Sequence, residues 1–350
     1  MRWATVTAAA SAALLLGAAA CSSDSGTDAA GTEATGSDSA TATLTMYSGQ
    51  HESLAQALAD GFEADTGIHI DVRAGKDAEM VGQIIEEGDR SKADLIITEE
   101  PGPIGSLDEL GLLSEVEETV LEDVDERFVP STGNWLPWAA RSRVIYYNPE
   151  LIDEDELPDS VLDLADEKYE GQFAYAPSGA FKSTTAYLIN TIGEEETLEW
   201  LEAVKANGVD EQKNGKVRDS VEAGQHPFGL SNHYYWYILA ADSGGQDELT
   251  SKVHFMNADD AGALMLASGA GLLKSSDHQA EGAQFLEWLA SPTGGQQVVA
   301  EASPQFPLAP GVVSDHELPT IDELSFPEFD QASLQNVDEA NALLLQAGII

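Results

Sequence analysis

The sequence predicts an α/β protein with two lobes, and three observations support this fold class. Strands and helices are expected to alternate along most of the chain, which is typical of βαβ units with mainly parallel sheets. The run at 95–97, Leu-Ile-Ile, is continuously apolar, as expected for a strand that is buried on both faces. The chain has 350 residues, which is too long for one small core and favours two domains.

The first half of the body begins with a strand, a helix and a second strand. Leu-Thr-Met-Tyr at 44–47 is typical of a short buried strand, and apolar residues then recur at helical spacing over 54–62. Gly67 ends this helix as a glycine C-terminal cap. Apolar and polar residues alternate over 68–72, which predicts the next strand. A second amphipathic helix ends at Gly88, just before the continuous apolar run.

The same alternation predicts the elements of the second half. Ser231 and Asn232 are placed to cap a helix over 233–241. Further strands are expected at 144–147, 172–175 and 228–230, and further helices at 181–188, 285–289 and 338–346.

The composition excludes several classes of partner. Sixty-two acidic residues against 16 Lys and Arg give a formal net charge of −46. Nucleic acids and anionic membrane surfaces both need a basic footprint, so neither is an expected partner. Acidic residues spread over every helix indicate a solvated surface, and a metal site has to be argued from specific residues.

The N-terminus predicts export. An apolar, alanine-rich run over 1–20 is typical of a secretory signal peptide, and it leads into Cys21, the only Cys in the chain. A single Cys at a cleavage site predicts lipidation, with an incidental Cys after an ordinary signal as the alternative. The small polar residues up to 42 predict a flexible linker. We therefore expect a body anchored by lipid to the outer face of the cytoplasmic membrane.

Four polar loops follow predicted strands, where open α/β sheets bind their ligands. They contain His51, Glu99, the turn at 178–180, and the pair Tyr234 and Tyr235. Each has an ordinary interpretation as well: a surface histidine, an acidic loop, a tight turn or a packed aromatic cluster. Their shared position at strand ends is what favours a common site.

Two phenols, one carboxylate and one imidazole form a set of ligands suited to ferric iron. Tyrosine normally keeps its proton up to a pH near ~10, so only a strongly charged hard cation would ionise both phenols. Calcium prefers carboxylates and carbonyls, while zinc and copper prefer Cys and several His. Two phenolates and one carboxylate match the three charges of iron(III). The Ser178-Gly179-Ala180 turn, at a helix start, is suited to an accompanying anion.

The chain resembles the periplasmic ferric-ion-binding proteins, which are the substrate-binding components of bacterial iron(III) ABC transporters. The resemblance covers nearly all of the body from about residue 43. The matching stretches are YSGQHE at 47–52, ADTGI at 64–68, AGKDAEMVGQIIEEGDRSKADLIITE at 74–99, ARSRV at 140–144, PSGAF at 177–181, SNHYYWYILA at 231–240 and DDAGALMLASGAGLLKSS at 259–276.

The resemblance implies ligands, partners and lobe boundaries. It implies that His51, Glu99, Tyr234 and Tyr235 bind Fe3+ and that a synergistic anion such as phosphate or carbonate completes the shell. The implied anion contacts are Ser178, Gly179, Ala180, Asn214 and Asn232. It further implies a monomer of the two-lobed type II binding-protein fold, which closes by a hinge and delivers iron to an ABC permease and its ATPase. The expected parts are 43–142 and 265–316 in the N-lobe, 143–264 in the C-lobe, and a C-terminal helical segment over 317–350 that packs on the C-lobe.

Two residues depart from the family pattern. Glu100 stands where relatives commonly have Gln, and its carboxylate could repel the anion or reach the metal in its place. His233 replaces an amide and is a possible competing ligand, ranked below His51.

Three other functions compete with iron binding. The same fold captures polyamines and small anions, and acids with aromatic walls would suit a polyamine. A secreted metal-dependent hydrolase is disfavoured because the sequence has no HExxH, no G-x-S-x-G and no second His or Cys cluster. An adhesive or structural lipoprotein is disfavoured by the absence of repeats. The sequence favours a binding protein, not an enzyme.

Overall fold

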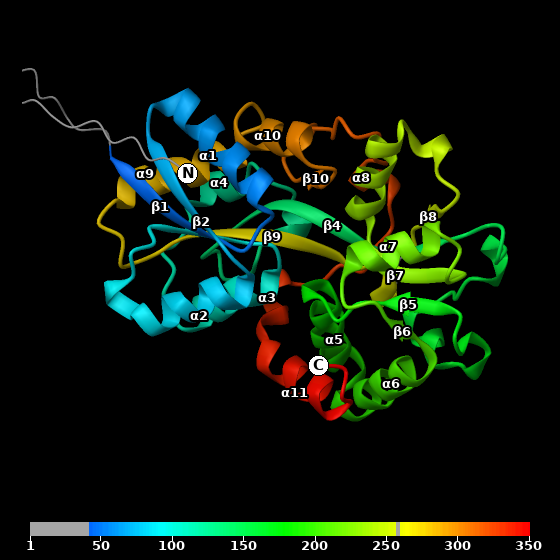
Figure 1. Cartoon of the computed structure of the whole chain (residues 1–350). Helices are drawn as coiled ribbons and strands as arrows, with labels where there is room; N and C mark the ends of the chain where they lie inside the picture. The colour runs from blue at the N-terminus through cyan, green and yellow to red at the C-terminus, as the bar shows by residue number, and fades with distance from the viewer. Residues whose placement is uncertain (1–41, 257–259) are drawn as a thin grey trace, which may run out of the picture. The chain divides into compact units, whose positions relative to one another are not determined.

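The computed structural model describes residues 42–256 and 260–350, which Figure 1 shows as a ribbon. The expected signal peptide over 1–20, Cys21 and nearly all of the expected linker lie outside the described residues. Within the described ranges, no helix is long and apolar enough to cross a membrane.

Strands and helices alternate along the body. The strands are β1 (Thr43–Ser48), β2 (His69–Ala74), β3 (Leu95–Thr98), β4 (Leu136–Tyr147), β5 (Phe173–Tyr175), β6 (Val209–Asp210), β7 (Phe228–Asn232), β8 (Lys252–His254), β9 (Met265–Leu272) and β10 (Phe306–Pro307). The α-helices are α1 (Glu52–Thr66), α2 (Asp77–Glu87), α3 (Pro101–Glu109), α4 (Glu118–Leu121), α5 (Gly179–Ile192), α6 (Glu194–Asn207), α7 (Asn214–Glu222), α8 (His233–Ser243), α9 (Gln279–Ala290), α10 (Gly295–Ala302) and α11 (Val337–Gln346).

The strands form one mixed sheet in the order β2-β1-β3-β9-β4-β7-β5-β6, with β8 and β10 each pairing with β4. The outer pairs are parallel: β1 with β2 and β3, and β5 with β6 and β7. The central pairs, β3 with β9, β9 with β4, and β4 with β7, are antiparallel. The expectation of mainly parallel sheets therefore holds only for the outer strands. The reason is that β4 and β9 carry the chain between the lobes in opposite directions.

The first lobe packs apolar side chains on both faces of its strands. Leu95 and Ile97 belong to a core that is completed by α1, α9 and α10, whereas Ile96 belongs to a second core completed by α2 and α3. Successive side chains of a strand point to opposite faces, so the unbroken apolar run of β3 supplies both cores. Figure 1 shows the two groups of helices on opposite sides of β1 and β9.

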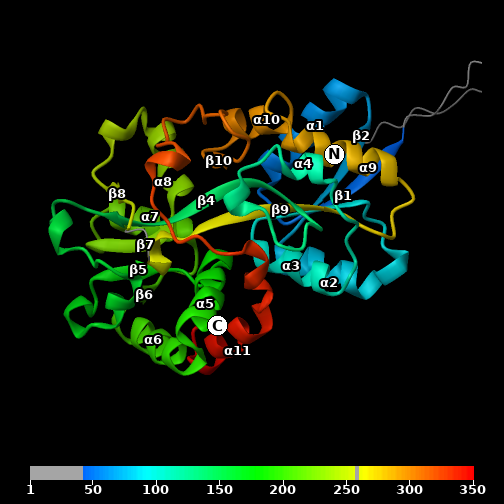
Figure 2. The ribbon, with the colours of Figure 1, turned by 180° about the vertical axis from the view of Figure 1, so that it is seen from behind.

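The second lobe repeats this arrangement. Ile145 and Tyr147 pack into a core with α5, α6 and α11, while Val144 and Tyr146 pack with α8 on the other face. Figure 2, seen from behind, places α5, α6 and α11 together on one side of β5 and β7. The two lobes thus have separate cores joined through one sheet.

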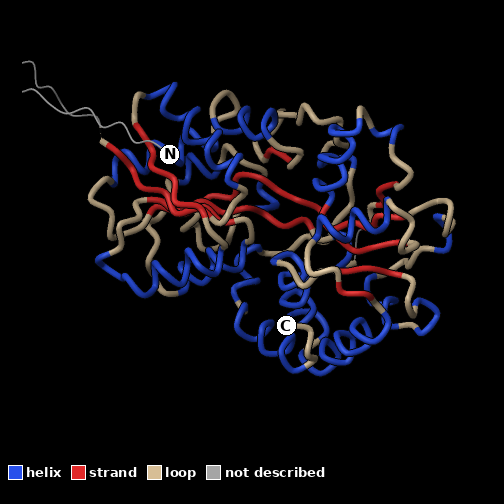
Figure 3. The backbone as a smooth tube through the Cα atoms, viewed as in Figure 1, coloured by secondary structure: helices blue, strands red, loops and turns tan. Residues whose placement is uncertain are grey.

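β4, which connects the two lobes, is the element whose length was predicted least well from the sequence. We expected a strand over 144–147, but the strand runs without interruption from Leu136 to Tyr147. Its first seven residues lie beside β9 and β10, and from Arg143 onward it pairs with β7 and β8. The part that was not predicted includes Arg141 and Arg143, whose side chains are both fully buried. Figure 3 shows β4 and β9 as the long strands that run between the two halves.

The C-terminal segment contacts helices of both lobes. A 3-10 turn over Gln331–Gln335 packs against α3 and α5, and α11 packs against α5, α6 and α3. The end of the chain therefore bridges α3 of the first lobe and α5 and α6 of the second lobe.

Candidate functional site

The candidate site lies at the carboxyl ends of strands from both lobes. A cleft of about 720 Å3 opens there. Its lining from the first lobe includes His51, Glu99 and Glu100, and its lining from the second lobe includes Ser178 and Gly179. The cleft is thus lined by four of the predicted residues, His51, Glu99, Ser178 and Gly179, which come from the first three of the four loops, as the strand-end rule expects.

The tyrosine pair lies in the first turn of α8, which directly follows β7. Adjacent residues of a helix diverge by only about 100°, so both rings leave the same end of the helix. The ring centroids of Tyr234 and Tyr235 are 4.3 Å apart with an angle of 33° between their planes. The next aromatic side chain points away: the indole N–H of Trp236 donates to Ser251 Oγ at 3.0 Å inside the core. The SNHYYWY segment therefore divides into two tyrosines at the site and a packed remainder.

Three of the four proposed ligands meet at the Tyr234 hydroxyl. That hydroxyl donates a hydrogen bond to Glu99 Oε1 at 2.6 Å, and it lies 3.4 Å from His51 Nε2. His51 Nε2 and Glu99 Oε1 are 3.8 Å apart, and the His51 ring stands edge-on to Tyr235 at 6.2 Å between centroids. His51 and Glu99 follow β1 and β3, so the ligands come together from both lobes.

The two phenols are held in their neutral form by their surroundings. Burial raises the pKa of Tyr234 well above its usual value, and the Glu99 carboxylate raises it further. Burial likewise raises the pKa of Tyr235, again reinforced by Glu99. An ionised pair would therefore need a strong cation at the same point to compensate its charge. The set of donors fits a hard trivalent metal ion.

Asp77, at the start of α2, positions the loop that carries Glu99, and sequence reasoning missed it. Its Oδ1 accepts the backbone N–H of Glu99 and its Oδ2 that of Glu100, both at 3.0 Å. Burial, with the neighbouring carboxylates, raises the pKa of Asp77 to about 7. Gly49 makes room for it, since a Cβ at residue 49 would overlap Asp77 Oδ1. A carboxylate at a helix start is common, so the sequence gives no specific signal for this role.

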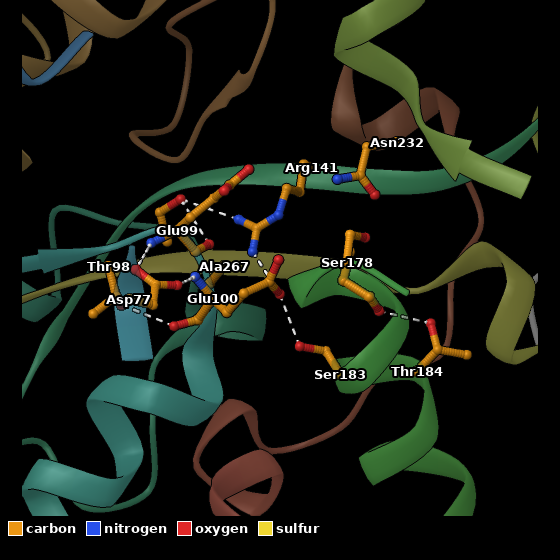
Figure 4. Close-up of polar contacts among 12 residues, drawn as sticks. Asp77, Thr98, Glu99, Glu100, Arg141, Ser178, Ser183, Thr184, Asn232 and Ala267 are labelled. Atoms are coloured by element: carbon orange, nitrogen blue, oxygen red, sulfur yellow. Dashed lines mark hydrogen bonds and ion pairs between the residues drawn. The ribbon is translucent and has the colours of Figure 1, made fainter. Parts of the chain in front are cut away.

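Glu100 lies in a buried polar cluster, which Figure 4 shows. Its Oε2 is 2.8 Å from Arg141 Nη2 and accepts a hydrogen bond from Ser183 Oγ at 2.8 Å. Burial alone would lower the pKa of Arg141, but the Glu100 and Glu99 carboxylates raise it overall. Arg141 also donates to Ser268 Oγ at 3.1 Å. Sequence reasoning missed Arg141 and Ser183; the signal for Arg141 was a charged residue within an apolar stretch.

The residues proposed for an anion divide into two groups. Ser178 is the N-cap residue of α5, so Gly179 and Ala180 begin that helix. Ser178 Oγ lies 3.5 Å from Asn214 Oδ1, which links the start of α7 to the same place.

Asn232 is already engaged elsewhere. Its Oδ1 accepts a hydrogen bond from Arg143 Nη1 at 2.7 Å, and it makes no side-chain cap to α8. The expected capping of that helix by Ser231 and Asn232 is therefore wrong, because the buried guanidinium of Arg143 takes the amide oxygen instead.

His233 is turned toward β4 and away from the cleft. Its Nδ1 accepts the backbone N–H of Ser142 at 3.1 Å, and its ring stacks on Phe306 at 4.5 Å between centroids. Burial lowers the pKa of His233 to about 3, so the ring is neutral. These contacts favour a structural role for His233, in keeping with its rank below His51.

Comparison with known proteins identifies a family and several relatives of this chain. Residues 48–296 match the family described as bacterial extracellular solute-binding protein. The Fe(3+)-binding periplasmic protein of Serratia marcescens is 33% identical over 308 residues, which are 88% of this chain and 90% of that one. The major ferric iron-binding protein of Neisseria meningitidis is 35% identical over 313 residues, covering 89% and 94% of the two chains. The crystal structure of iron-bound HitA from Pseudomonas aeruginosa superposes with a TM-score of 0.82 at 38% identity, covering 88% of this chain and 99% of that one.

Proposed function

The chain belongs to the family of bacterial extracellular solute-binding proteins, and from this premise we propose that it captures ferric iron between its lobes for uptake into the cell. The proposed ligands are His51, Glu99, Tyr234 and Tyr235. Its relatives in Serratia and Neisseria are named as iron-binding proteins rather than enzymes, which answers the hydrolase alternative.

One observation carries this proposal. The Tyr234 hydroxyl lies within 2.6 Å of a carboxylate and 3.4 Å of an imidazole that come from the opposite lobe. A metal ion that replaced the phenol proton at this point would meet an oxygen anion and a nitrogen at once. Ligands drawn from both lobes also make ion capture and lobe closure the same event.

The wider setting of the proposal rests on the sequence. A signal peptide over 1–20 and a lipid on Cys21 would anchor the protein to the outer face of the cytoplasmic membrane. A monomer there would pass its iron to an ABC permease driven by its ATPase. Replacement of Cys21 by Ser should release the mature protein into the medium or periplasm, and it should abolish incorporation of labelled palmitate.

The anion is the part of the expectation that the geometry supports least. Phosphate or carbonate was expected at Ser178, Gly179, Ala180, Asn214 and Asn232. Asn232 is held by Arg143, and Glu100 lies against the start of α5. A polyamine is also poorly served, because one of the two carboxylates it would use is paired with Arg141.

Absorption spectroscopy tests the metal and its ligands together. Iron-free protein is titrated with ferric ion, and a visible phenolate-to-iron charge-transfer band is expected in the wild type. Tyr234→Phe and Tyr235→Phe should each weaken or abolish the band. Tyr237→Phe is the matched control, because Tyr237 lies in the same helix but packs in the core, so its band should equal that of the wild type.

Two outcomes would refute iron binding. The first is no band and no iron after dialysis in the wild type. The second is a band that survives in both site variants. Titration with spermidine, followed by calorimetry, would then test the polyamine alternative.

A further inference from the structure

The two tyrosines of the site are supported from different sides. The Tyr234 hydroxyl is hydrogen-bonded to Glu99 of the first lobe at 2.6 Å. Tyr235 meets the first lobe more loosely, because the His51 ring stands edge-on to it at 6.2 Å between centroids. Within its own lobe, α7 lies beside α8 in both ribbon views (Figures 1 and 2). α7 is therefore well placed to fix Tyr235.

Arg218 on α7 reaches the backbone of Tyr235. Its Nη1 donates a hydrogen bond to the Tyr235 carbonyl oxygen at 3.1 Å. A carbonyl oxygen has two lone pairs, so it can accept this bond as well as one from within its helix. Hydrogen bonds from a charged donor are the stronger kind, and only 18% of the Arg218 side chain is accessible to competing water. The bond holds the backbone from which the Tyr235 ring departs.

The guanidinium of Arg218 is itself oriented by its neighbour. Its Nε and Nη2 donate to Asp219 Oδ1 at 3.0 and 2.6 Å. The guanidinium is planar, so once two of its nitrogens are tied to a carboxylate the third points in a set direction. Asp219 thus directs Nη1 of Arg218 toward the Tyr235 carbonyl.

Arg218 belongs to a row of polar side chains along one face of α7. Asn214, Arg218 and Glu222 are spaced four residues apart, so they lie on the same side of the helix. The Asn214 side chain makes a hydrogen bond to the Tyr235 hydroxyl. The start of this row therefore holds Tyr235 at both ends, by its phenol and by its backbone.

The end of the row supports the residue that follows Tyr235. Glu222 Oε2 accepts a hydrogen bond from Ser251 Oγ at 2.5 Å, and Ser251 Oγ in turn accepts the indole N–H of Trp236. Arg218 stands between this anchored end and Asn214, where it alone joins α7 to the Tyr235 backbone among the described side-chain hydrogen bonds.

We propose that Arg218 is a positioning residue for Tyr235, whose bond to the Tyr235 carbonyl sets where the second phenol stands and thereby how tightly ferric ion is held. The inference rests on the proposed function and deepens it, because Arg218 is not among the residues that line the cleft. Groups that orient metal ligands from behind affect metal affinity without touching the metal. The guanidinium keeps its charge at every physiological pH, so this support is constant.

The first experiment observes Tyr235 without iron. Protein labelled with fluorotyrosine is studied by fluorine NMR, and the Tyr235 resonance is the one that disappears in Tyr235→Phe. Arg218→Met, Arg218→Lys and Lys216→Met are compared with the wild type. Lys216→Met is the matched control: it also removes a positive charge from α7, but the Lys216 side chain is 65% accessible and its pair with Asp219 is 3.9 Å long.

The second experiment loads the same proteins with ferric ion. The dissociation constant is measured by competition with a chelator, and the phenolate-to-iron charge-transfer band is recorded. The melting temperature of each iron-free protein is measured alongside. A merely structural role of Arg218 would lower the melting temperature but leave the band of the loaded protein where it is in the wild type.

Arg218→Met should displace or broaden the Tyr235 resonance, shift the charge-transfer band and weaken iron binding by about tenfold. Arg218→Lys keeps the charge but loses the planar fork, so its iron affinity should fall between those of the wild type and Arg218→Met. Lys216→Met should match the wild type in all three measurements.

The other outcomes overturn the inference. An unchanged Tyr235 resonance in Arg218→Met would show that Arg218 does not position Tyr235. A changed resonance with wild-type iron affinity and band would show that the position does not matter for the metal. An equal loss in Lys216→Met would indicate a general effect of charge.

Two further cases are also decided. If Arg218→Met does not fold, Arg218→Lys is judged by the same criteria. Failure of the proposed function is distinct, because the wild type then binds no iron, while the fluorine resonance still reports whether Arg218 holds Tyr235.

Discussion

Glu99 and Glu100 are neighbours in the sequence, yet they belong to two different kinds of region. Glu99 is partly exposed, with 23% of its side chain accessible, and its partners are a phenol and an imidazole. Glu100 is 6% accessible in its side chain and faces a guanidinium and a hydroxyl. Extended backbone sends successive side chains to opposite sides, which is how one loop serves both regions.

The difference lies in how each region balances its charge. Around Glu99 the partners are groups that can lose protons, so the balance depends on a cation from outside. Around Glu100 the cation is Arg141, which keeps its charge at every physiological pH. The region around Glu99 is suited to a change of charge when a cation binds, whereas the charge of the region around Glu100 stays constant. The predictions below test this contrast.

Removal of Arg141 should have the largest effect. Arg141→Met leaves the Glu100 carboxylate buried without its cation, which should lower the free energy of unfolding by ~3–5 kcal/mol. Urea unfolding of the iron-free protein measures this. The double variant with Glu100→Gln should recover part of the loss, since no unpaired charge remains. Equal destabilisation in the single and double variants would show that the pair is not coupled.

Removal of the charge of Glu99 should affect iron rather than stability. Glu99→Gln takes away one of the proposed anionic ligands, and we expect the iron affinity to fall by ~100-fold, the upper end for losses of ligand-supporting groups. Added phosphate should not restore the affinity, because the lost carboxylate comes from the loop after β3. Competition with a chelator of known affinity gives the value. Rescue of Glu99→Gln by phosphate would contradict the separate roles of the two carboxylates.

Asp77 joins the two regions, and its replacement should have a smaller effect on both. Asp77→Asn keeps the shape but retains only one acceptor oxygen for two backbone N–H groups, so iron affinity should fall ~10-fold. Gly49→Ala should act alike, because the new methyl group displaces the Asp77 carboxylate. Unfolding measured alongside separates positioning from stability. A loss of stability as large as that of Arg141→Met would argue against a positioning role.

Removal of an exposed ion pair should have the smallest effect on stability, so it serves as the reference for the larger effects above. His69 Nδ1 lies 2.7 Å from Glu63 Oε2, with about half of each side chain accessible. The hydrogen bond to Glu63 raises the pKa of His69. The protonated form is therefore stabilised on folding, so its contribution is complete below the unfolded pKa of about 6.5 and is lost as pH rises through the folded pKa.

The corresponding experiment compares His69→Gln with the wild type. The difference in melting temperature should be small, larger at pH 5 than at pH 8, and reduced by high salt. A difference that grows with pH would reverse the sign and reject the assignment.

Much of the fold could be predicted because it depends on local pattern. Helical spacing located α1 and α11, and the apolar run located β3. The strand-end rule identified the four loops of the site before any spatial information. What could not be predicted depends on distant partners. Arg141 is compatible with a buried strand only because Glu100 meets it from 41 positions earlier in the chain, and Ser183 reaches Glu100 across 83 positions.

The same limit explains the details that were wrong. Asn232 has the residue type of a helix cap, but Arg143 from β4 claims its side chain. β9 was not identified as a strand, and the antiparallel crossing of β4 and β9 depends on how two lobes share one sheet. No local pattern contains that information.

The placement of the two arginines has a consequence for anyone who redesigns this protein. Arg141 and Arg143 stand where β4 leaves the strands of one core for those of the other. The buried positive charge and the point at which β4 changes its partner strand therefore lie in the same three residues, Arg141 to Arg143. A substitution there, made to alter the charge near the cleft, also alters the strand that joins the two cores. A change meant to alter only the chemistry of the cleft is therefore better made at a partly exposed residue outside β4, such as Glu99.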